Sequence, residues 1–312
     1  MAGHHPRRLA LGLALLLLTV PPLAMAQPAS DQAKTRYPIV LIHGFLGFDT
    51  LLGMDYWFGI PGPLREAGAT VFVPQVAAID SNEARGEQLL RQLARYRAQS
   101  GVEKFNLIGH SQGGMTARYV AAQRPEWVAS ITTVGSPHKG SAFADWLRAR
   151  FAEGSIGERL AVGAFALTGR LIDLGSRGGY GQQPLAALGS MTSAGAADFN
   201  ARHPAGIPTT DCGEGEHEVD GIRFWSWGSI GHFSTGIDPS DGVLWLTGLP
   251  FEEENDGLVG RCSTHFGEVL RDDYRHNHMD QTNLLFGLDG GGEDEPVALY
   301  LAHAARLKAA GL

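Results

Sequence analysis

The sequence predicts an α/β protein whose mainly parallel sheet is covered by helices on both faces. The prediction comes from two observations: short apolar runs rich in β-branched residues, and amphipathic stretches that alternate with them. Strands that alternate with helices are joined by crossovers, which make the strands parallel and place helices on the faces. A chain of 312 residues that is 44% hydrophobic is long and apolar enough for its own core.

Expected elements follow one another regularly in the first half of the chain. Residues 37–42 (YPIVLI) read as a buried strand that ends at His43-Gly44. Residues 82–100 read as an amphipathic helix, because Leu89, Leu93 and Tyr96 recur at helical spacing. The further strands expected here are 71–73, 105–108 and 131–134, and a further helix is 115–123.

The second half is less regular. Residues 141–175 look helical, residues 176–206 look rich in loops, residues 222–227 predict another strand, and residues 296–312 predict a last helix.

The net charge of −8 disfavours a nucleic-acid binder, which needs a basic surface for phosphates. A disordered protein is excluded by the apolar content, and no repeat of 20–50 residues indicates a solenoid or propeller.

The first 26 residues have the pattern of a secretory signal peptide. Arg7 and Arg8 precede an apolar run over residues 9–20, and residues 24–26 form an A-x-A cleavage pattern. A membrane anchor is the alternative, but this run is shorter than the roughly 20 residues a span needs. We therefore expect export through the periplasm to the outside of the cell, a single domain over residues 27–312 and no stable membrane span.

Cys212 and Cys262 are the two cysteines of the chain. They lack the C-x-x-C spacing of a metal or redox site. Because export leads to an oxidising compartment, we expect one disulfide between them.

Residues 109–113 (GHSQG) match the G-x-S-x-G pattern of a nucleophile. The pattern follows an expected strand and precedes an expected helix, which is the context that a nucleophile elbow requires. The small residues let the backbone turn sharply, and the helix N-terminus directs N–H groups at developing negative charge. The alternative is an ordinary glycine-rich turn.

A serine hydroxyl needs a base and a group that orients the base. His276 and His278 lie late in the chain in a polar loop (YRHNHMD) and are the best candidates for the base. A zinc site built on these two histidines lacks a second Cys/His cluster. The sequence leaves four candidates for the acid: Asp241, Asp256, Asp272 and Asp273.

The chain contains several sequence motifs that are more specific than the general hydrolase pattern: YPIVLIHGFLGFD, DYWFGIP, RGEQLL, NLIGHSQGG, GSPHKGS, CGEG, DPSD, NDGLVG and RHNHMDQTN. Together, from about Tyr37 to Leu307, they resemble the secreted true lipases of Pseudomonas and Burkholderia, bacterial lipase family I. The resemblance implies an α/β-hydrolase fold with a helical lid and an extracellular triacylglycerol lipase that works through an acyl-enzyme.

The resemblance also implies roles for single residues. Ser111 matches the family nucleophile, Asp256 in NDGLVG the acid, and His278, not His276, the base. The backbone N–H groups of Phe45 and Gln112 match the oxyanion hole. The family often has Met or Leu at Phe45 and Gln or His at Gln112, changes that should alter pocket packing more than catalysis.

One structural Ca²⁺ per chain is implied in the same way. Its ligands would be the carboxylates of Asp238 and Asp280 and the backbone carbonyls of Leu284 and Leu288. Many relatives carry Gln at the position of Leu284, a change that a main-chain ligand should tolerate. Cys212 and Cys262 match the family disulfide, and the family's membrane-bound foldase is an implied partner during secretion.

The substrate class depends on residues 148–175, which belong to the lid of about residues 141–175 that the resemblance implies. Its apolar residues Leu160, Leu167, Leu171 and Leu174 are joined by Val162, Phe165 and Ile172, a stripe wider than packing on one partner requires. An ordinary core helix is the alternative. Three other functions stay open: a carboxylesterase of soluble esters, an acyltransferase or polyester hydrolase, and a non-catalytic protein that kept the fold.

Overall fold

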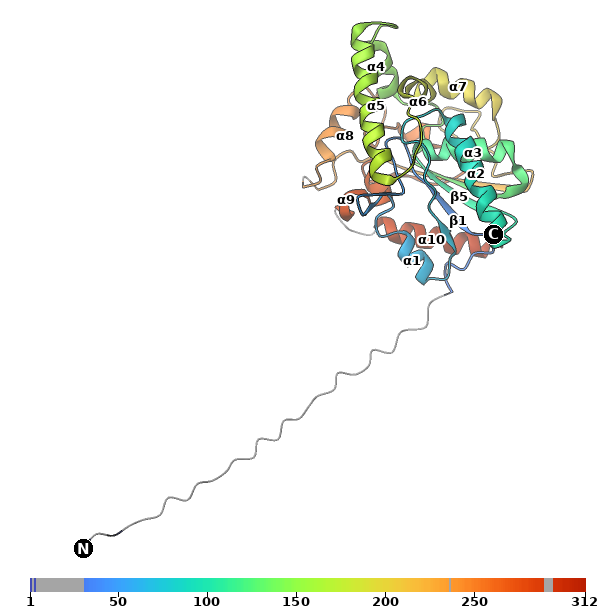
Figure 1. Cartoon of the computed structure of the whole chain (residues 1–312). Coiled ribbons are helices and arrows are strands. Elements are labelled where there is room, and N and C mark those ends of the chain that lie inside the picture. Colours follow the sequence, from blue (N-terminus) through green and yellow to red (C-terminus); the bar gives the residue numbers. More distant parts are fainter. Residues whose placement is uncertain (2, 4–30, 236, 289–293) are drawn as a thin grey trace.

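The computed structural model describes residues 31–312 except 236 and 289–293, together with Met1 and Gly3. The rest of the expected signal peptide, residues 2 and 4–26, lies outside the described residues. The centre is a seven-stranded sheet in the order β4-β1-β5-β6-β8-β7, with β9 paired to β8 (Figure 1). Its strands are β1 (Ile39–Ile42), β4 (Val71–Phe72), β5 (Phe105–His110), β6 (Val128–Val134), β7 (Glu218–Val219), β8 (Ile222–Ser229) and β9 (Glu268–Tyr274).

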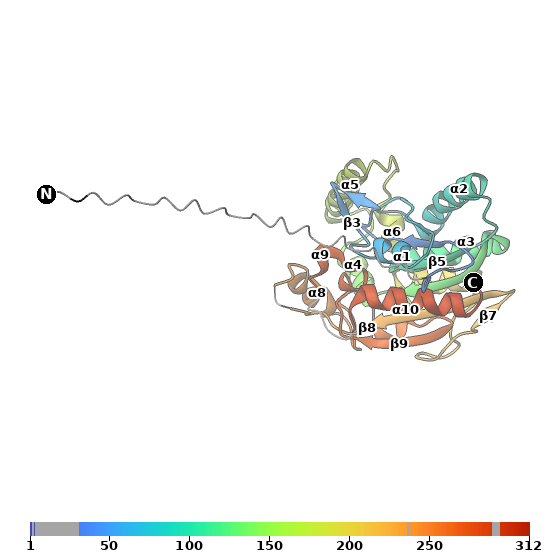
Figure 2. The ribbon, with the colours of Figure 1, turned by 90° about the horizontal axis from the view of Figure 1, so that it is seen from below.

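All pairs in this sheet are parallel except β7 with β8. Alternate residues of β1 enter two different cores, as the period of two requires. Ile39 and Leu41 pack with α1 (Pro61–Glu66) and α10 (Pro296–Ala309). On the other face, Val40 and Ile42 pack with α2 (Asn82–Ser100) and α3 (Gln112–Gln123), and both layers can be followed in Figure 2. The predicted sheet covered on both faces is confirmed.

Local signals explain where the covering helices begin and end. The Ser81 side chain caps α2 by accepting from Ala84 N–H, and Gly101 ends it with φ 71°. Helix α10 begins at Pro296, and the carboxylate of Glu295 accepts two N–H groups of its first turn.

The helical segment predicted over residues 141–175 is two helices, α4 (Ala142–Arg150) and α5 (Ile156–Ser176). We call α4 and α5 together the cover. The break has a local cause, because Ser155 caps a new helix by accepting from Glu158 N–H. The cover crosses the upper part of the molecule in Figure 1.

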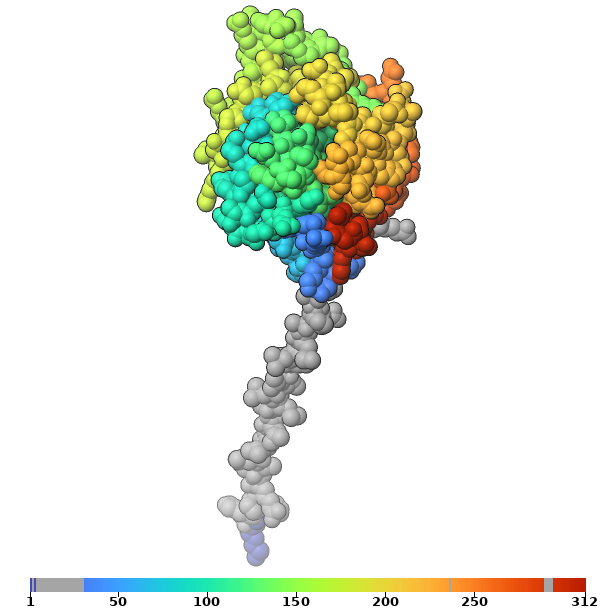
Figure 3. Space-filling view, turned by 90° about the vertical axis from the view of Figure 1, so that its right-hand side faces the viewer, coloured from blue at the N-terminus to red at the C-terminus, as the bar shows by residue number. Residues whose placement is uncertain are grey.

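The loop-rich prediction for residues 176–206 is wrong. This segment contains α6 (Pro184–Met191) and α7 (Ser193–Arg202), the second capped by Thr192. Small residues without a strong apolar stripe hid both helices. Figure 3 shows α7 and the residues after it beside α3, where Arg118 donates a 2.6 Å hydrogen bond to the carbonyl of His203.

The remaining elements are short. They are the hairpin β2 (Thr50–Leu51) and β3 (Met54–Asp55), helices α8 (Asp241–Gly248) and α9 (Leu284–Gly287), and 3₁₀ turns η1 (Pro125–Trp127), η2 (Arg261–Thr264) and η3 (Asp280–Thr282). No helix in the described part of the chain is long and apolar enough to cross a bilayer. The carboxyl ends of β1 and β5 lie side by side, which brings the loop after His43 next to Ser111.

Candidate active site

Ser111 occupies the turn between β5 and α3, with φ 54° and ψ −128°. The two glycines of the motif make this turn possible. A Cβ on Gly109 would lie 2.4 Å from backbone atoms of Gly113, and one on Gly113 would lie 2.2 Å from the carbonyl oxygen of Ile42. Any larger residue would therefore push the serine turn away from the sheet.

A buried acid orients His278. Nδ1 of His278 lies 2.7 Å from Oδ2 of Asp256, and both side chains are almost fully buried. The amide of Gln281 donates to the same oxygen at 2.7 Å, while Oδ1 accepts the N–H groups of Leu258 and Val259. With Nδ1 against a carboxylate, the neutral ring carries its proton there and leaves Nε2 as the acceptor.

The other candidates from the sequence are engaged elsewhere. Asp272 and Asp273 pair with arginines, and Asp241 accepts backbone N–H groups near its own helix. The ring of His276 stacks on a tyrosine, 5.8 Å between centroids, and it does not line the cavity that Ser111 lines. Asp256 meets the candidate base His278, whose ring lines the same cavity as Ser111.

The loop after β1 lies beside the serine, since a Cβ on Gly44 would be 2.8 Å from Cβ of Ser111. Arg85 donates to the carbonyl of Gly44 at 3.0 Å, and the opposite end of that trans peptide is the N–H of Phe45. Burial lowers the pKa of Arg85 to about 10, so the guanidinium stays charged at neutral pH. Among the described residues, no hydrogen-bond acceptor is found for the N–H groups of Phe45 and Gln112.

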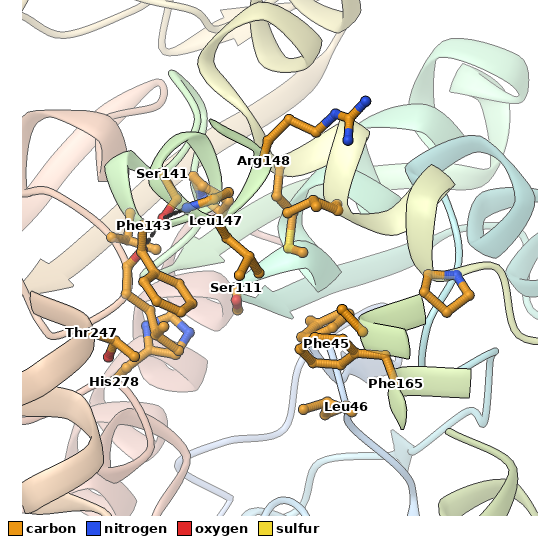
Figure 4. Close-up of a pocket in the computed structure, with 18 of the residues that line it drawn as sticks. Phe45, Leu46, Ser111, Ser141, Phe143, Leu147, Arg148, Phe165, Thr247 and His278 are labelled. Atoms are coloured by element: carbon orange, nitrogen blue, oxygen red, sulfur yellow. Dashed lines mark hydrogen bonds between the residues drawn. The ribbon is translucent and has the colours of Figure 1, made fainter. Parts of the chain in front are cut away.

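Ser111 and His278 line one cavity of about 330 Å³. Figure 4 shows Ser111 between Phe143 and His278 on one side and Phe45 and Phe165 on the other. Most of the wall is apolar and comes from the cover, α6, α8 and the loops before and after β9, including Leu147, Val162, Leu188, Val243, Leu258 and Met279. The cavity thus offers a hydroxyl and an imidazole to a mainly apolar ligand.

Comparison with known proteins shows the family of the chain. Residues 37–282 match the family model described as alpha/beta hydrolase fold. A triacylglycerol lipase of Vibrio cholerae is 51% identical over 93% of this chain and 93% of its own. One of Pseudomonas fragi is 42% identical over 90% and 99%, and one of Burkholderia plantarii is 37% identical over 96% and 93%. The chain belongs to the bacterial triacylglycerol lipase family of α/β hydrolases.

Solved structures support the hydrolase fold at much lower identity. A mature lipase of Bacillus licheniformis aligns with a TM-score of 0.58 at 17% identity, covering 91% of this chain and 95% of that one. A metagenomic carboxyl esterase aligns with a TM-score of 0.60 at 15% identity, covering 88% and 76%. Lipases and esterases share this fold, so the fold alone does not choose between lipid and soluble ester.

The acidic residues expected to bind calcium lie beside the hydrolase site. Asp238 and Asp280 are both buried, and Oδ1 of Asp280 has no hydrogen-bond partner among the described residues. Burial, with nearby Asp238, raises the pKa of Asp280 to about 7. Leu284 begins α9 soon after Asp280, and Leu288 follows it, in a turn where Leu285 and Phe286 have positive φ. The described residues contain no group of three or more His, Cys, Asp or Glu side chains fit for a metal.

Cys212 and Cys262 form a disulfide, which closes a loop between sequence positions 50 apart.

The sequence analysis missed the roles of four residues near the site: Gln281, Arg85, Tyr56 and His110. All four stand in motifs that carried the resemblance, RHNHMDQTN, RGEQLL, DYWFGIP and NLIGHSQGG, but a motif does not say what its residues bond.

Proposed function

We propose that this chain is an extracellular triacylglycerol lipase that hydrolyses ester bonds at an oil–water interface. The observation that carries the proposal is that His278, which is held by the buried Asp256, lines the same apolar cavity as Ser111. The family relatives named triacylglycerol lipase support the substrate class.

Ser111 is the nucleophile, His278 the base and Asp256 the group that orients it. Nε2 of His278 takes the serine proton as Oγ attacks the ester carbonyl. The N–H groups of Phe45 and Gln112 stabilise the oxyanion. The alcohol leaves with the proton from His278, and water, activated by the same ring, releases the fatty acid from the acyl-enzyme.

The buried carboxylates of Asp238 and Asp280 fit a structural Ca²⁺, because an oxygen without a partner beside a second acid calls for a cation. The carbonyls of Leu284 and Leu288 would complete the set. A bound ion would neutralise the two acids. Since Asp280 is two residues after His278, its anchoring keeps the imidazole in place.

The cover supports action on lipid rather than on soluble esters. Val162 and Phe165 of α5 line the cavity, whereas Leu160, Leu167 and Leu174 of the same helix are 60–76% exposed. A helix that is apolar toward both the cavity and the solvent gains stability where its outer face meets lipid. The cover is thus a lid that favours an interface.

Residues 1–26 act as the export signal in this proposal, and the family's foldase assists folding in the periplasm. The Cys212–Cys262 disulfide is compatible with an oxidising destination.

The test compares emulsified triolein with soluble p-nitrophenyl butyrate, using the secreted chain and Ser111→Ala. We expect high activity on the emulsion, a loss on calcium chelation and no turnover by Ser111→Ala at an unchanged Tm. Activity on the soluble ester alone would make the chain a carboxylesterase. Full activity of Ser111→Ala would overturn the assignment of the nucleophile.

A further inference from the structure

Three buried hydrogen bonds join the oxyanion loop to the loop of the base. The N–H of Gly44 lies 3.1 Å from Oη of Tyr56, this oxygen lies 2.7 Å from Nδ1 of His110, and Nε2 of His110 lies 3.0 Å from the carbonyl oxygen of His278. All four residues are buried. His110 is also the residue directly before the nucleophile Ser111, and Tyr56 lines the same cavity as Ser111.

The direction of each bond is fixed by chemistry. A carbonyl oxygen only accepts, so Nε2 of His110 must donate to His278. Burial and nearby His278 hold the pKa of His110 well below its usual range, so the ring is neutral and its Nδ1 accepts. Tyr56 therefore donates its hydroxyl proton to His110, and its oxygen accepts the N–H of Gly44.

Close packing leaves these groups little freedom. A Cβ on Gly44 would lie 2.8 Å from Cβ of Ser111 and 3.0 Å from Oη of Tyr56. The rings of His110 and His278 lie 4.6 Å apart between centroids. On the other side of the His43–Gly44 peptide, Arg85 binds the carbonyl of His43, so Tyr56 and Arg85 hold opposite ends of one peptide.

We propose that Tyr56 and His110 are positioning residues that set the oxyanion loop and the catalytic histidine relative to each other. The inference rests on the proposed function of Ser111 and His278. Neither side chain exchanges a proton with substrate. Each acts through the backbone of its neighbour, which places the N–H of Phe45 and the ring of His278 around the same tetrahedral centre.

Tyr56→Phe tests the bonds from the Tyr56 hydroxyl to Gly44 and His110, because it removes one oxygen and leaves the ring in place. We expect kcat on p-nitrophenyl butyrate to fall roughly tenfold, as for a buried donor left unpaired, with KM within about twofold. Binding of a trifluoromethyl ketone, whose adduct with Ser111 carries an oxyanion, should weaken by a similar factor. Tyr119→Phe is the matched control, since its hydroxyl bonds Glu87 at the surface.

Two substitutions of His110 separate its bond to Tyr56 from its bond to the carbonyl of His278. Gln places a donor at the position of Nε2 and keeps the bond to the carbonyl of His278, whereas Asn reaches only the position of Nδ1 and keeps the bond to Tyr56. Because Tyr56 still accepts the N–H of Gly44 in both backgrounds, adding Tyr56→Phe should lower kcat in each, but by a smaller factor in His110→Gln, where the hydroxyl has already lost His110, than in His110→Asn. His303→Gln removes another buried imidazole, bonded to Thr132, and controls for stability.

Wild-type kcat and inhibitor affinity in Tyr56→Phe would overturn the inference. Equal effects of Tyr56→Phe in both His110 backgrounds, or losses of kcat that follow Tm across all variants including His303→Gln, would also overturn it. Ser111→Ala keeps the two failures apart. If that variant is inactive while Tyr56→Phe is fully active, the proposed nucleophile stands and the positioning role fails.

Discussion

The turn around Ser111 and the cover line the same cavity but are packed in opposite ways. At the turn, the residues from His110 to Gly114 are all buried, and both motif glycines touch backbone that a Cβ would overlap. In α5, only Glu158 and Gly169 are buried, and its leucines face solvent. The first region is closely packed, and the second exposes apolar surface to water.

This difference separates two tasks that the proposed reaction requires. Electrostatic stabilisation of an oxyanion needs donors that are in place before the reaction begins. Admission of a lipid needs a segment whose stability changes with its surroundings. A substitution that changes backbone geometry should therefore be severe at the turn and mild in the cover.

Gly113→Ala should give the largest effect. Its Cβ would lie 2.2 Å from the carbonyl oxygen of Ile42, where backbone meets backbone and neither can yield easily. We expect loss of activity on every ester, with poor folding or a Tm lowered by many degrees. Thermal unfolding and turnover of p-nitrophenyl butyrate measure both.

Gly163→Ala is the same substitution in α5 and serves as its control. Nothing lies within 4 Å of the added Cβ, and the position is an exposed helix interior. Helix propensity predicts a gain in the free energy of unfolding of about 0.5–1 kcal/mol with activity retained. If Gly163→Ala were as damaging as Gly113→Ala, the contrast in packing would be wrong.

Asp256→Asn keeps the size of the side chain but changes what it offers to Nδ1 of His278. Two backbone N–H groups already bind Oδ1, so the amide would present its nitrogen to a ring nitrogen that must donate. The wrong tautomer should lower kcat about 10³- to 10⁴-fold while Tm changes little. A decrease below about tenfold in single-turnover acylation would remove Asp256 from the proposed triad.

The sequence predicted the structure of the turn around Ser111 better than that of the cover, and the reasons are physical. The turn is encoded locally, since a strand, two glycines and a helix start within a few residues leave a serine one conformation. The cover was predicted as helical, but its break at Ser155 depends on a single cap. Helices α6 and α7 were missed because their small residues carry little periodic signal.

The resemblance anticipated how His278 and Asp256 would meet, which the residues alone did not decide among four acids. What no pattern could supply is the bonding between distant residues. Tyr56 and His110 are 54 positions apart, and His110 and His278 are 168 apart. Such contacts depend on the register of β1 with β5 and on the path of the loop after β9.

Replacing two outer leucines of α5, Leu167→Ser with Leu171→Ser, should produce a smaller and selective effect. Both side chains are about 60% exposed, so the fold loses little in water. At an oil surface, their burial would contribute free energy, and losing it should lower activity on emulsified triolein about tenfold. The rate on p-nitrophenyl butyrate should not change. Equal losses on both substrates would point to packing rather than to the interface.

The smallest effect should come from an ion pair that joins the two helices of the cover. Arg148 of α4 lies 2.5 Å from Glu158 of α5, and Glu158 also accepts the N–H of Gly154 between them. Glu158→Gln keeps that acceptor and removes the charge, so activity on emulsions should change by less than about twofold.

The acidity of Glu158 makes this small effect measurable. The Gly154 N–H, aided by Arg148, lowers the pKa of Glu158 below its ordinary 4.5. A carboxyl whose pKa is lower in the folded state stabilises that state above its unfolded pKa and loses this contribution as the pH falls through the folded value. The Tm difference between the wild type and Glu158→Gln should therefore be present at pH 7 and vanish in acid. A difference that grows in acid would mean that the charge does not stabilise the cover.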